Sequence, residues 1–242
     1  MKIDHWYARY GNNIMQIAHC CDYAFEKKKA HMIVFPDHPY FTTKHIVNPD
    51  ESVCKCDNVI KNAEFFHTSE CGTSFSETWA HRKNILRKYC MSIFPNEMLK
   101  DMNKLLYDCC VHIRSGDTKY MISGGYVRQP LLYFKKIINL MLENDRTIYI
   151  LFEDDEIDVY KAICEQYKNN KLVTISTRKT IEEDLNILIR CKHLITSVGT
   201  FGLISYMLSP NVTDVYVSLR RNDKFDFDDD PMVNLHVVDY YK

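Results

Sequence analysis

Three polar residues follow a short apolar run in the middle of the chain. His112 comes directly after residues 109–111. Arg114 follows it after one intervening residue, and Asp117 follows Arg114 after two. A guanidinium offers a fixed fork of donors that matches phosphate, and it stays charged in any surroundings. A carboxylate can accept the proton of an attacking hydroxyl. The spacing therefore combines an anion ligand, Arg114, with a candidate general base, Asp117.

An apolar run that ends in polar residues predicts a buried strand followed by a loop. In an open α/β sheet, ligands bind beyond the carboxyl ends of the strands, so polar groups clustered there are placed for a ligand. An isolated arginine at a strand end more often forms a surface ion pair. The assignment of Arg114 to a ligand therefore depends on the other loops of the chain.

Strands and helices alternate in the pattern of apolar residues, which predicts a parallel sheet with helices on both faces. Residues 11–13 break the first strand, Pro130 suits the first turn of a helix, and Thr180 to Glu183 have the spacing of a capping box. We expect strands at 2–10, 31–35, 109–113, 147–152, 172–176, 193–197, 214–219 and 236–240, and helices at 14–28, 77–89, 96–106, 130–143, 157–168, 180–191 and 201–208.

The alternating pattern occurs once before residue 106 and once after it. We therefore expect two domains, 1–106 and 107–242, each a Rossmann-like half, with a cleft between them. Residues 36–76 are polar, show no clear period and predict irregular structure with one short strand near Val59. A stretch of this length without regular structure is unusual in a compact domain.

Composition excludes several classes of protein. The 242 residues are 46% hydrophobic and 26% charged, which is ordinary for a soluble globular protein. The net charge of -1 gives no field for nucleic acid or an anionic membrane. The N-terminus has no apolar signal segment, and no run reaches the roughly 18 apolar residues of a membrane span. We expect a cytoplasmic protein with no membrane span and no nucleic-acid partner.

Ten cysteines raise the question of disulfides or a metal. Most of them fall in predicted apolar helices and strands, where reduced thiols behave as small core hydrophobes. The remaining group, Cys54, Cys56, Cys71 and Cys90, has none of the usual zinc spacings. A cysteine-based metalloprotein is therefore the least favoured alternative.

Four loops at predicted strand ends carry motifs that resemble one enzyme family. Residues 112–117 (HIRSGD) are similar to the H-I-R-R-G-D motif of the α-1,2-fucosyltransferases, glycosyltransferase family 11, with Ser115 in place of the second arginine. Residues 11–18 (GNNIMQIA) resemble the family's G-N-Q-L-F-Q-Y-A segment, and residues 152–155 (FEDD) resemble F-S-D-D. Arg9 and Asn12 also match the R-F-G-N of the more distant protein O-fucosyltransferases.

The sharpest match lies further along the chain. Residues 184–202 (DLNILIRCKHLITSVGTFG) are similar to the run D-L…C-K-H…T-I-G-T-F-G of the α-1,2-fucosyltransferases. The family continues with tryptophan and alanine where this chain has Leu203 to Tyr206, so the resemblance does not extend to the subfamily or the acceptor. Residues 36–108 match no motif that we can name.

The resemblance implies a GT-B fold and transfer of L-fucose, with inversion, from GDP-fucose to a glycan hydroxyl, most closely in an α-1,2 linkage. It implies no metal or other cofactor, a GDP-sugar donor held mainly by residues 107–242, and an oligosaccharide or glycoconjugate acceptor on residues 1–106. Arg114 would stabilise the leaving diphosphate, and Asp184 would accept the N–H donors of guanine. The implied donor-binding residues are Arg9, Gly11, Asn12, His112, Arg114, Asp184, Gly199, Thr200 and Phe201.

Several readings stay open at this point. Asp117 is the nearest candidate for the general base, but it could instead hold Arg114 or the loop. Asp184 equally suits a structural role near a helix N-terminus. The acids Glu153 to Asp155 could hold a divalent metal in a GT-A enzyme, although they lack a D-x-D spacing. Other candidates are a transferase for another GDP-sugar and a nucleotide-sugar-binding or lectin-like module without turnover.

Overall fold

The chain forms two compact units, residues 1–99 and 100–242, in a computed structural model. The structure describes residues 3, 5–6, 10–27, 32–41, 45–49, 79–114, 129–153, 157–176, 179–197, 199–218 and 232–238. The sequence placed the domain boundary at residue 106, immediately before the first strand of the second unit.

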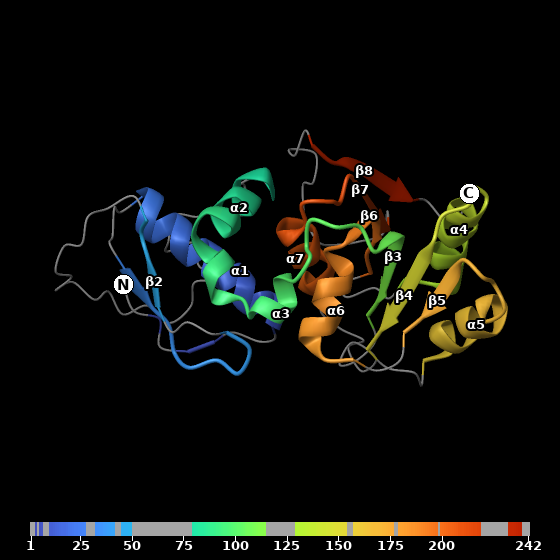
Figure 1. The fold of residues 1–242 in the computed structure, drawn as a ribbon, viewed down its shortest axis with the longest axis horizontal. Coiled ribbons are helices and arrows are strands. Elements are labelled where there is room, and N and C mark those ends of the chain that lie inside the picture. The colour runs from blue at the N-terminus through green and yellow to red at the C-terminus, as the bar shows by residue number, and fades with distance from the viewer. Residues whose placement is uncertain are drawn as a thin grey trace. The chain divides into compact units, whose positions relative to one another are not determined.

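The second unit is built on a six-stranded sheet in which every neighbouring pair is parallel (Figure 1). The spatial order is β5-β4-β3-β6-β7-β8. This is a doubly wound order, and it reverses direction between β3 and β6, the point where such sheets bind ligands. The strands are β3 (Tyr107–Ile113), β4 (Ile148–Phe152), β5 (Val173–Ile175), β6 (Cys191–Ile195), β7 (Asp214–Ser218) and β8 (Asn234–Val238).

Helices cover both faces of this sheet, as the alternating pattern predicted. They are α4 (Leu131–Leu142), α5 (Asp158–Tyr167), α6 (Ile181–Leu188) and α7 (Thr200–Leu208). Val111 and Ile113 of β3 pack into a core with residues of α4 and α5. The alternate residues, Cys110 and His112, face α6 and α7, since the Cys110 thiol donates to the carbonyl of Ile187 at 3.7 Å. Figure 1 shows the two helix pairs on opposite sides of β3.

Local sequence signals explain where two of these helices begin. Thr180 caps α6 in a capping box, in which Glu183 N–H donates to Thr180 Oγ1 at 3.2 Å and Thr180 N–H donates to Glu183 Oε2 at 2.9 Å. Pro130 is the N-cap of α4, where its missing N–H costs no hydrogen bond. Both sequence predictions are confirmed.

The first unit contains α1 (Tyr10–Cys21), which continues as the π-helix η1 (Asp22–Lys27). Its two described strands, β1 (Met32–Val34) and β2 (His45–Val47), pair antiparallel. The expected parallel sheet of this half is therefore not what the described residues form. The remaining elements are α2 (Trp79–Ile85), η3 (Leu86–Cys90), η4 (Met91–Ile93) and α3 (Asn96–Leu99).

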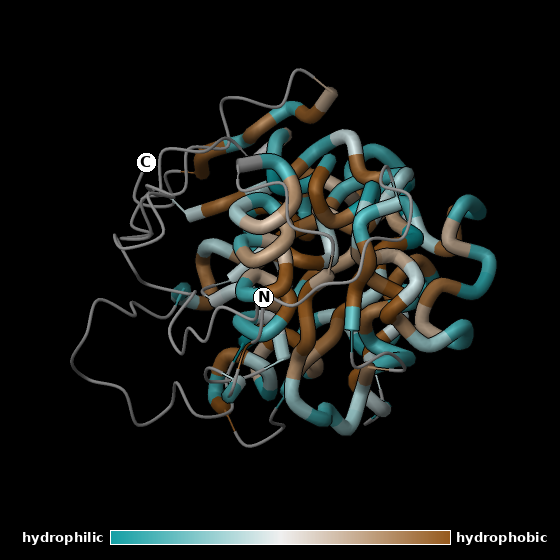
Figure 2. Tube along the Cα trace, turned by 90° about the vertical axis from the view of Figure 1, so that its left-hand side faces the viewer, coloured by the Kyte–Doolittle hydropathy of each residue, from teal (hydrophilic) through white to brown (hydrophobic). Residues whose placement is uncertain are grey.

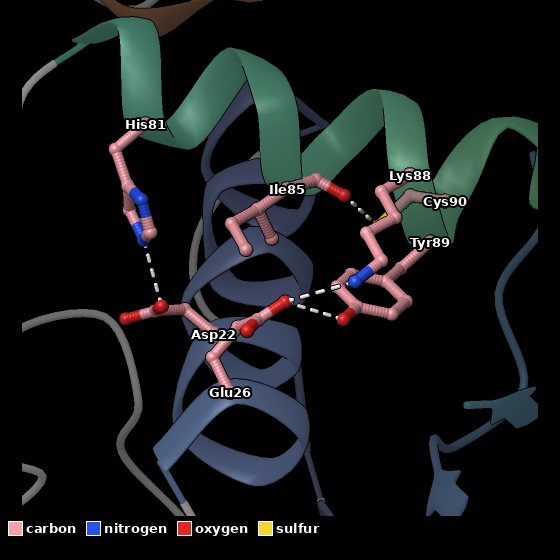
Figure 3. A network of polar contacts seen from close by, with 7 residues as sticks. All are labelled: Asp22, Glu26, His81, Ile85, Lys88, Tyr89 and Cys90. Carbon is pink, nitrogen blue, oxygen red and sulfur yellow. Dashed lines mark hydrogen bonds and ion pairs between the residues drawn. The ribbon is translucent and has the colours of Figure 1, made fainter. Parts of the chain in front are cut away.

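Ion pairs and hydrogen bonds connect η1 to the helical segment α2–η3 (Figure 3). His81 Nε2 lies 2.7 Å from Oδ1 of the buried Asp22, and Lys88 Nζ lies 3.3 Å from Glu26 Oε1. Tyr89 donates its hydroxyl hydrogen bond to the same Glu26 oxygen. Residues about 60 positions apart in the chain thus form the framework of the first unit.

Three expected elements differ from the structure. Residues 11–13 are the first turns of α1, not a loop, because Tyr10 already begins the helix and polar side chains are well tolerated near a helix start. The described part of 2–10, residues 3 and 5–6, is not a strand, although Ile3 N–H donates to Val34 O of β1 at 2.8 Å. The helix expected over 96–106 ends at Leu99, and Asp101 has a positive φ of 52°.

Smaller differences concern β6 and the irregular segment. β6 begins at Cys191, two residues before its expected start, and β2 is a strand that the sequence did not predict. The strand expected near Val59 lies outside the described residues.

Apolar and hydrophilic stretches alternate along the chain (Figure 2). The described cysteines are free thiols, and all but the half-buried Cys164 are buried, as expected of core hydrophobes. Among the described residues, no helix has the length and apolar character needed to cross a membrane.

Candidate functional site

The carboxyl ends of β3 and β6 are joined by a hydrogen bond at the switch point of the sheet. The backbone N–H of Arg114, the residue after β3, donates to Oγ of Ser197 at 2.8 Å. Ser197 follows β6 and is buried. Two of the loops singled out in the sequence, 112–117 and 197–201, therefore begin side by side, where a doubly wound sheet binds its ligand.

Arg114 packs against the backbone of Gly199. A Cβ atom added to Gly199 would lie 2.5 Å from Arg114 Nη1 and 3.0 Å from Arg114 Cδ and Cζ. Gly199 also has φ 98° and ψ 176°, a backbone conformation that is essentially restricted to glycine. Glycine is thus required at this position both for the turn and for the space that the arginine side chain occupies.

Gly199 is the N-cap of α7, so the arginine lies at the start of a nine-residue helix. The first N–H groups of a helix have no partner within the helix, and its dipole favours negative charge there. The start of α7 and the guanidinium together supply donors and positive charge at one place. This combination is suited to a phosphate or diphosphate group.

His112 lies behind this site, fully buried at 1% exposure. Its ring centroid is 5.4 Å from that of Phe201, and its Nε2 lies 3.8 Å from Oε1 of Glu153 at the end of β4. Among the described residues, neither ring nitrogen of His112 has a hydrogen-bond partner. A buried imidazole with both nitrogens unsatisfied is unusual, and it marks this position as a polar contact point for a ligand.

Packing beneath the site holds these groups in place. A Cβ atom on Gly202 would lie 2.9 Å from Thr196 Cγ2 and 3.7 Å from His112 Nδ1, so α7 approaches the sheet as closely as glycine allows. The buried Tyr133 hydroxyl lies 2.9 Å from each of the carbonyl oxygens of Thr196 and Tyr216, and it can donate to either. The ends of β6 and β7 are thereby held together beneath the turn that leads to Gly199.

Asp184 lies on α6 and is the described carboxylate with the strongest electrostatic perturbation. Burial is the main cause that brings the pKa of Asp184 up to about 7, while the charge of Lys179 opposes the shift and the charges of Glu183 and Glu153 add to it. Its Oδ1 is buried with no hydrogen-bond partner among the described residues. A carboxylate in this state is a strong acceptor for a ligand that brings two N–H donors.

Five of the residues that the sequence proposed for the donor site lie at the switch point: His112, Arg114, Gly199, Thr200 and Phe201. A sixth, Asp184, is close enough to Glu153 at the end of β4 for the charge of Glu153 to raise its pKa. Gly11 and Asn12 lie in the first turn of α1 in the other unit. Arg9 and Asp117 fall outside the described residues, as do two of the three acids at 153–155. Within the described part of the chain, no three His, Cys, Asp or Glu side chains are grouped to hold a metal ion.

Sequence reasoning did not assign roles to Ser197 or Glu153 in this site. Ser197 accepts from the Arg114 backbone, and Glu153 lies beside His112. Both are polar residues at strand ends, which is the available signal. Their roles depend on which strands are neighbours, and the sequence does not give the strand order.

A doubly wound parallel sheet with polar groups at its switch point is an arrangement typical of nucleotide-binding α/β proteins. Its fold is similar to that of GT-B glycosyltransferases: the structure of POFUT1 in complex with GDP matches with a TM-score of 0.50 and 11% identity over 88% of this chain and 97% of that one. Two further structures match more weakly. POFUT1 in complex with GDP-fucose matches 55% of this chain with a TM-score of 0.38 and 12% identity. E. coli heptosyltransferase WaaC with ADP matches 57% of this chain with a TM-score of 0.36 and 10% identity. In these two matches the chain spans 49% and 44% of the other chain.

The model of glycosyl transferase family 11 matches residues 54–231, about three quarters of the chain. The chain therefore belongs to glycosyl transferase family 11, as its motifs indicated. No curated protein matches it.

Proposed function

We propose that this protein transfers L-fucose from GDP-fucose to a hydroxyl group of a glycan acceptor, with inversion at the sugar carbon. The observation that carries the proposal is the placement of Arg114 against Gly199 at the start of α7. Family membership and the similarity of the fold to a GDP-bound GT-B structure support it.

Charge development explains why this placement suits glycosyl transfer. As the bond between the sugar and the diphosphate breaks, negative charge grows on the leaving oxygen. A guanidinium and helix N–H groups fixed at that point stabilise the transition state more than the ground state. Because Arg114 and the start of α7 supply this charge, we propose that the reaction requires no metal ion.

The other donor contacts belong to the same proposal and rest on the family resemblance. Asp184 accepts the two N–H donors of the guanine base, His112 contacts the donor from beneath, and Thr200 and Phe201 present backbone N–H groups to the diphosphate. Arg9, Gly11 and Asn12 are assigned to the donor by the family resemblance. Asp117 is assigned as the general base because it is the candidate carboxylate nearest to Arg114 in the sequence. We propose an α-1,2 linkage, because the run at 184–202 is most similar to that subgroup.

A donor screen tests the proposal. Release of the nucleoside diphosphate, GDP or UDP, is measured with GDP-fucose, GDP-mannose and UDP-sugars across a panel of neutral oligosaccharide acceptors, with EDTA and with added manganese. We expect turnover with GDP-fucose that EDTA does not abolish, and an α-1,2 linkage in the product by NMR. Loss of activity in EDTA with recovery in manganese contradicts the metal-free mechanism, and preference for another donor contradicts fucosyl transfer.

Variants of Arg114 connect the activity to the site. Arg114→Ala should lower kcat by roughly 100-fold or more, as removal of one preorganised donor does elsewhere. Arg114→Lys should recover only part of the rate, because an ammonium lacks the planar fork. Arg146→Ala is the matched control. Arg146 Nη1 lies 3.9 Å from Asp108 Oδ1 near the amino-terminal end of β3, whereas Arg114 follows the carboxyl end of that strand. GDP binding without turnover in the wild type indicates a binding module instead.

A further inference from the structure

An aromatic cluster in the first unit has two layers with different exposure. Tyr10, Phe35 and Phe94 are buried. Trp6, His38, Tyr40 and Phe41, which we call the aromatic platform, lie against them and are each partly exposed. The pairs Phe25–Tyr89 and Tyr133–Phe134, by contrast, are buried on both sides. Aromatic rings that contact one another and remain partly open to solvent are a feature of ligand sites rather than of a core.

The buried layer fixes the platform from beneath. Trp6 stacks on Phe35 with ring centroids 5.4 Å apart and an interplanar angle of 5°. Tyr40 and Phe41 each lie 5.4 Å from Tyr10. Rings supported in this way have few alternative rotamers, so a ligand that stacks on them loses little of its binding free energy to side-chain ordering.

The platform rings also hold one another. His38 stacks on Phe41 at a centroid distance of 4.0 Å and an angle of 21°, and Trp6 lies 4.9 Å from His38. Trp6 Nε1–H donates to the carbonyl oxygen of Asp37 at 3.0 Å. Pro36 and Pro39 fix φ within the segment 35–41 (FPDHPYF) that carries three of the four rings. The platform is therefore preorganised.

The platform is uncharged at neutral pH. The backbone N–H of Tyr40 donates to His38 Nδ1 at 3.1 Å, so the ring proton is on Nε2, which donates to Asn13 Oδ1 at 3.1 Å. Burial lowers the pKa of His38 to about 4, so the ring stays neutral. The platform therefore consists of partly exposed neutral rings, with the exposed residue Asp37 beside them.

We propose that the aromatic platform binds a neutral sugar ring of the acceptor glycan. A pyranose has one face of C–H groups, whose partial positive charge is attracted to the negative face of an aromatic ring, and hydroxyl groups at its edge that can hydrogen-bond to a carboxylate such as that of Asp37. A nucleoside diphosphate needs cations and an anionic lipid needs a basic surface, and the platform offers neither. This inference rests on the proposed glycosyl transfer and assigns the class of acceptor to a surface of the first unit.

Trp6 gives a direct readout, because the chain has only two tryptophans. In the Trp79→Phe variant Trp6 is the sole tryptophan. This variant is titrated with lactose, maltose, cellobiose, chitobiose and mannobiose, with and without saturating GDP. We expect at least one disaccharide to shift the emission of Trp6 to the blue and to protect it from acrylamide quenching. No response to any of the five sugars overturns the proposal.

Substitutions separate stacking from structural effects. In the wild-type background, Trp6→Ala should weaken the effective sugar by roughly tenfold in saturation-transfer NMR, while Trp6→Phe keeps most of the affinity and neither variant changes the Kd of GDP. Tyr40→Leu provides a second test if Trp6→Ala does not fold. His38→Ala should weaken sugar binding. His236→Ala is the matched control and should leave sugar binding unchanged, because His236 is also stacked on an aromatic ring but lies in the second unit, with its ring centroid 4.4 Å from that of Tyr216.

The outcomes also separate this inference from the proposed function. If GDP-fucose is turned over and Trp6→Ala has the same KM for the acceptor as the wild type, the platform proposal is wrong and the proposed function stands. If a disaccharide protects Trp6 and no GDP-sugar is turned over, the sugar site stands and the proposed transfer is wrong.

Discussion

Nη1 of Arg114 lies 2.5 Å from the position that a Cβ atom on Gly199 would occupy. Every residue other than glycine has that atom, so the arginine and a side chain at position 199 cannot both keep their places. The relationship joins the end of β3 to the start of α7, two positions separated by 85 residues of sequence. It also makes the proposed diphosphate site sensitive to a single methyl group.

Gly199→Ala should therefore weaken donor binding indirectly, by moving Arg114 rather than by removing a contact to the donor. The substitution displaces Arg114 and places alanine at φ 98°, which costs about 1 to 3 kcal/mol. We expect a lower melting temperature and a Kd for GDP at least roughly tenfold higher by calorimetry. The double variant Arg114→Ala/Gly199→Ala should bind GDP about as poorly as Arg114→Ala alone. Full additivity of the two changes contradicts a shared origin.

Ser197→Ala tests the bond between β3 and β6. It removes the acceptor of the Arg114 backbone N–H, and an unpaired donor in this part-buried position lowers the free energy of unfolding by about 1 to 3 kcal/mol. Chemical denaturation measures this change. Ser205→Ala is the matched control, because the Ser205 hydroxyl donates only to Phe201 O, one turn back in the same helix, at 2.9 Å. Equal effects of the two substitutions count against a special role for Ser197.

Asp184 should make GDP binding depend on pH. With a pKa of about 7, the Asp184 carboxylate, which we propose accepts the guanine N–H groups, is present above pH 7 and is lost as the pH falls below it. GDP affinity should therefore decrease by up to about tenfold per pH unit below pH 7. The phosphate group of GDP also titrates near pH 6, so the pH profile of the wild type is compared with that of Asp184→Asn. This variant should bind GDP weakly and show only the pH dependence of GDP itself. Identical pH profiles exclude this role of Asp184.

The same substitution should stabilise the empty protein at alkaline pH. A carboxyl whose folded pKa is raised loses stability as the pH rises from its ordinary value near 4 to about 7. Asp184→Asn removes that loss, so we expect a higher melting temperature than the wild type at pH 8 and a smaller difference at pH 5. A melting temperature below the wild-type value at pH 8 would show that the carboxylate has a structural partner.

His38 should make the stability of the first unit fall in acid. Burial lowers its pKa to about 4, so between pH 6.5 and 4 the unfolded chain binds a proton that the folded ring does not. The free energy of unfolding therefore has its full value above pH 6.5 and decreases as the pH falls toward 4. The decrease is only about 1 kcal/mol, because the ring is partly exposed to solvent. His38→Gln should flatten this dependence in denaturation curves, and His45→Gln, at an exposed position of β2, should leave it unchanged.

Local signals in the sequence predicted most elements of the second unit to within two residues. The capping box at Thr180, the proline before α4 and the apolar runs of β3 and β4 each act through neighbouring residues, so they can be recognised without the fold. In the first unit the same reasoning misplaced 11–13 in a loop and overlooked β2. Tyr10 packs against Tyr40 and Phe41 from the segment after β1, contacts that no local pattern reveals.

The sequence by itself determined the alternation of strands and helices, the family motifs and the residue types of the donor site. Only the tertiary structure decided that β3 lies beside β6, that Arg114 packs against Gly199 and that burial brings the pKa of Asp184 to about 7. Strand order and burial arise from contacts between residues far apart in the chain, and these are not encoded in any short window of sequence. The aromatic platform has the same origin, because Trp6 contacts His38 and Phe41, which lie more than 30 positions further along the chain.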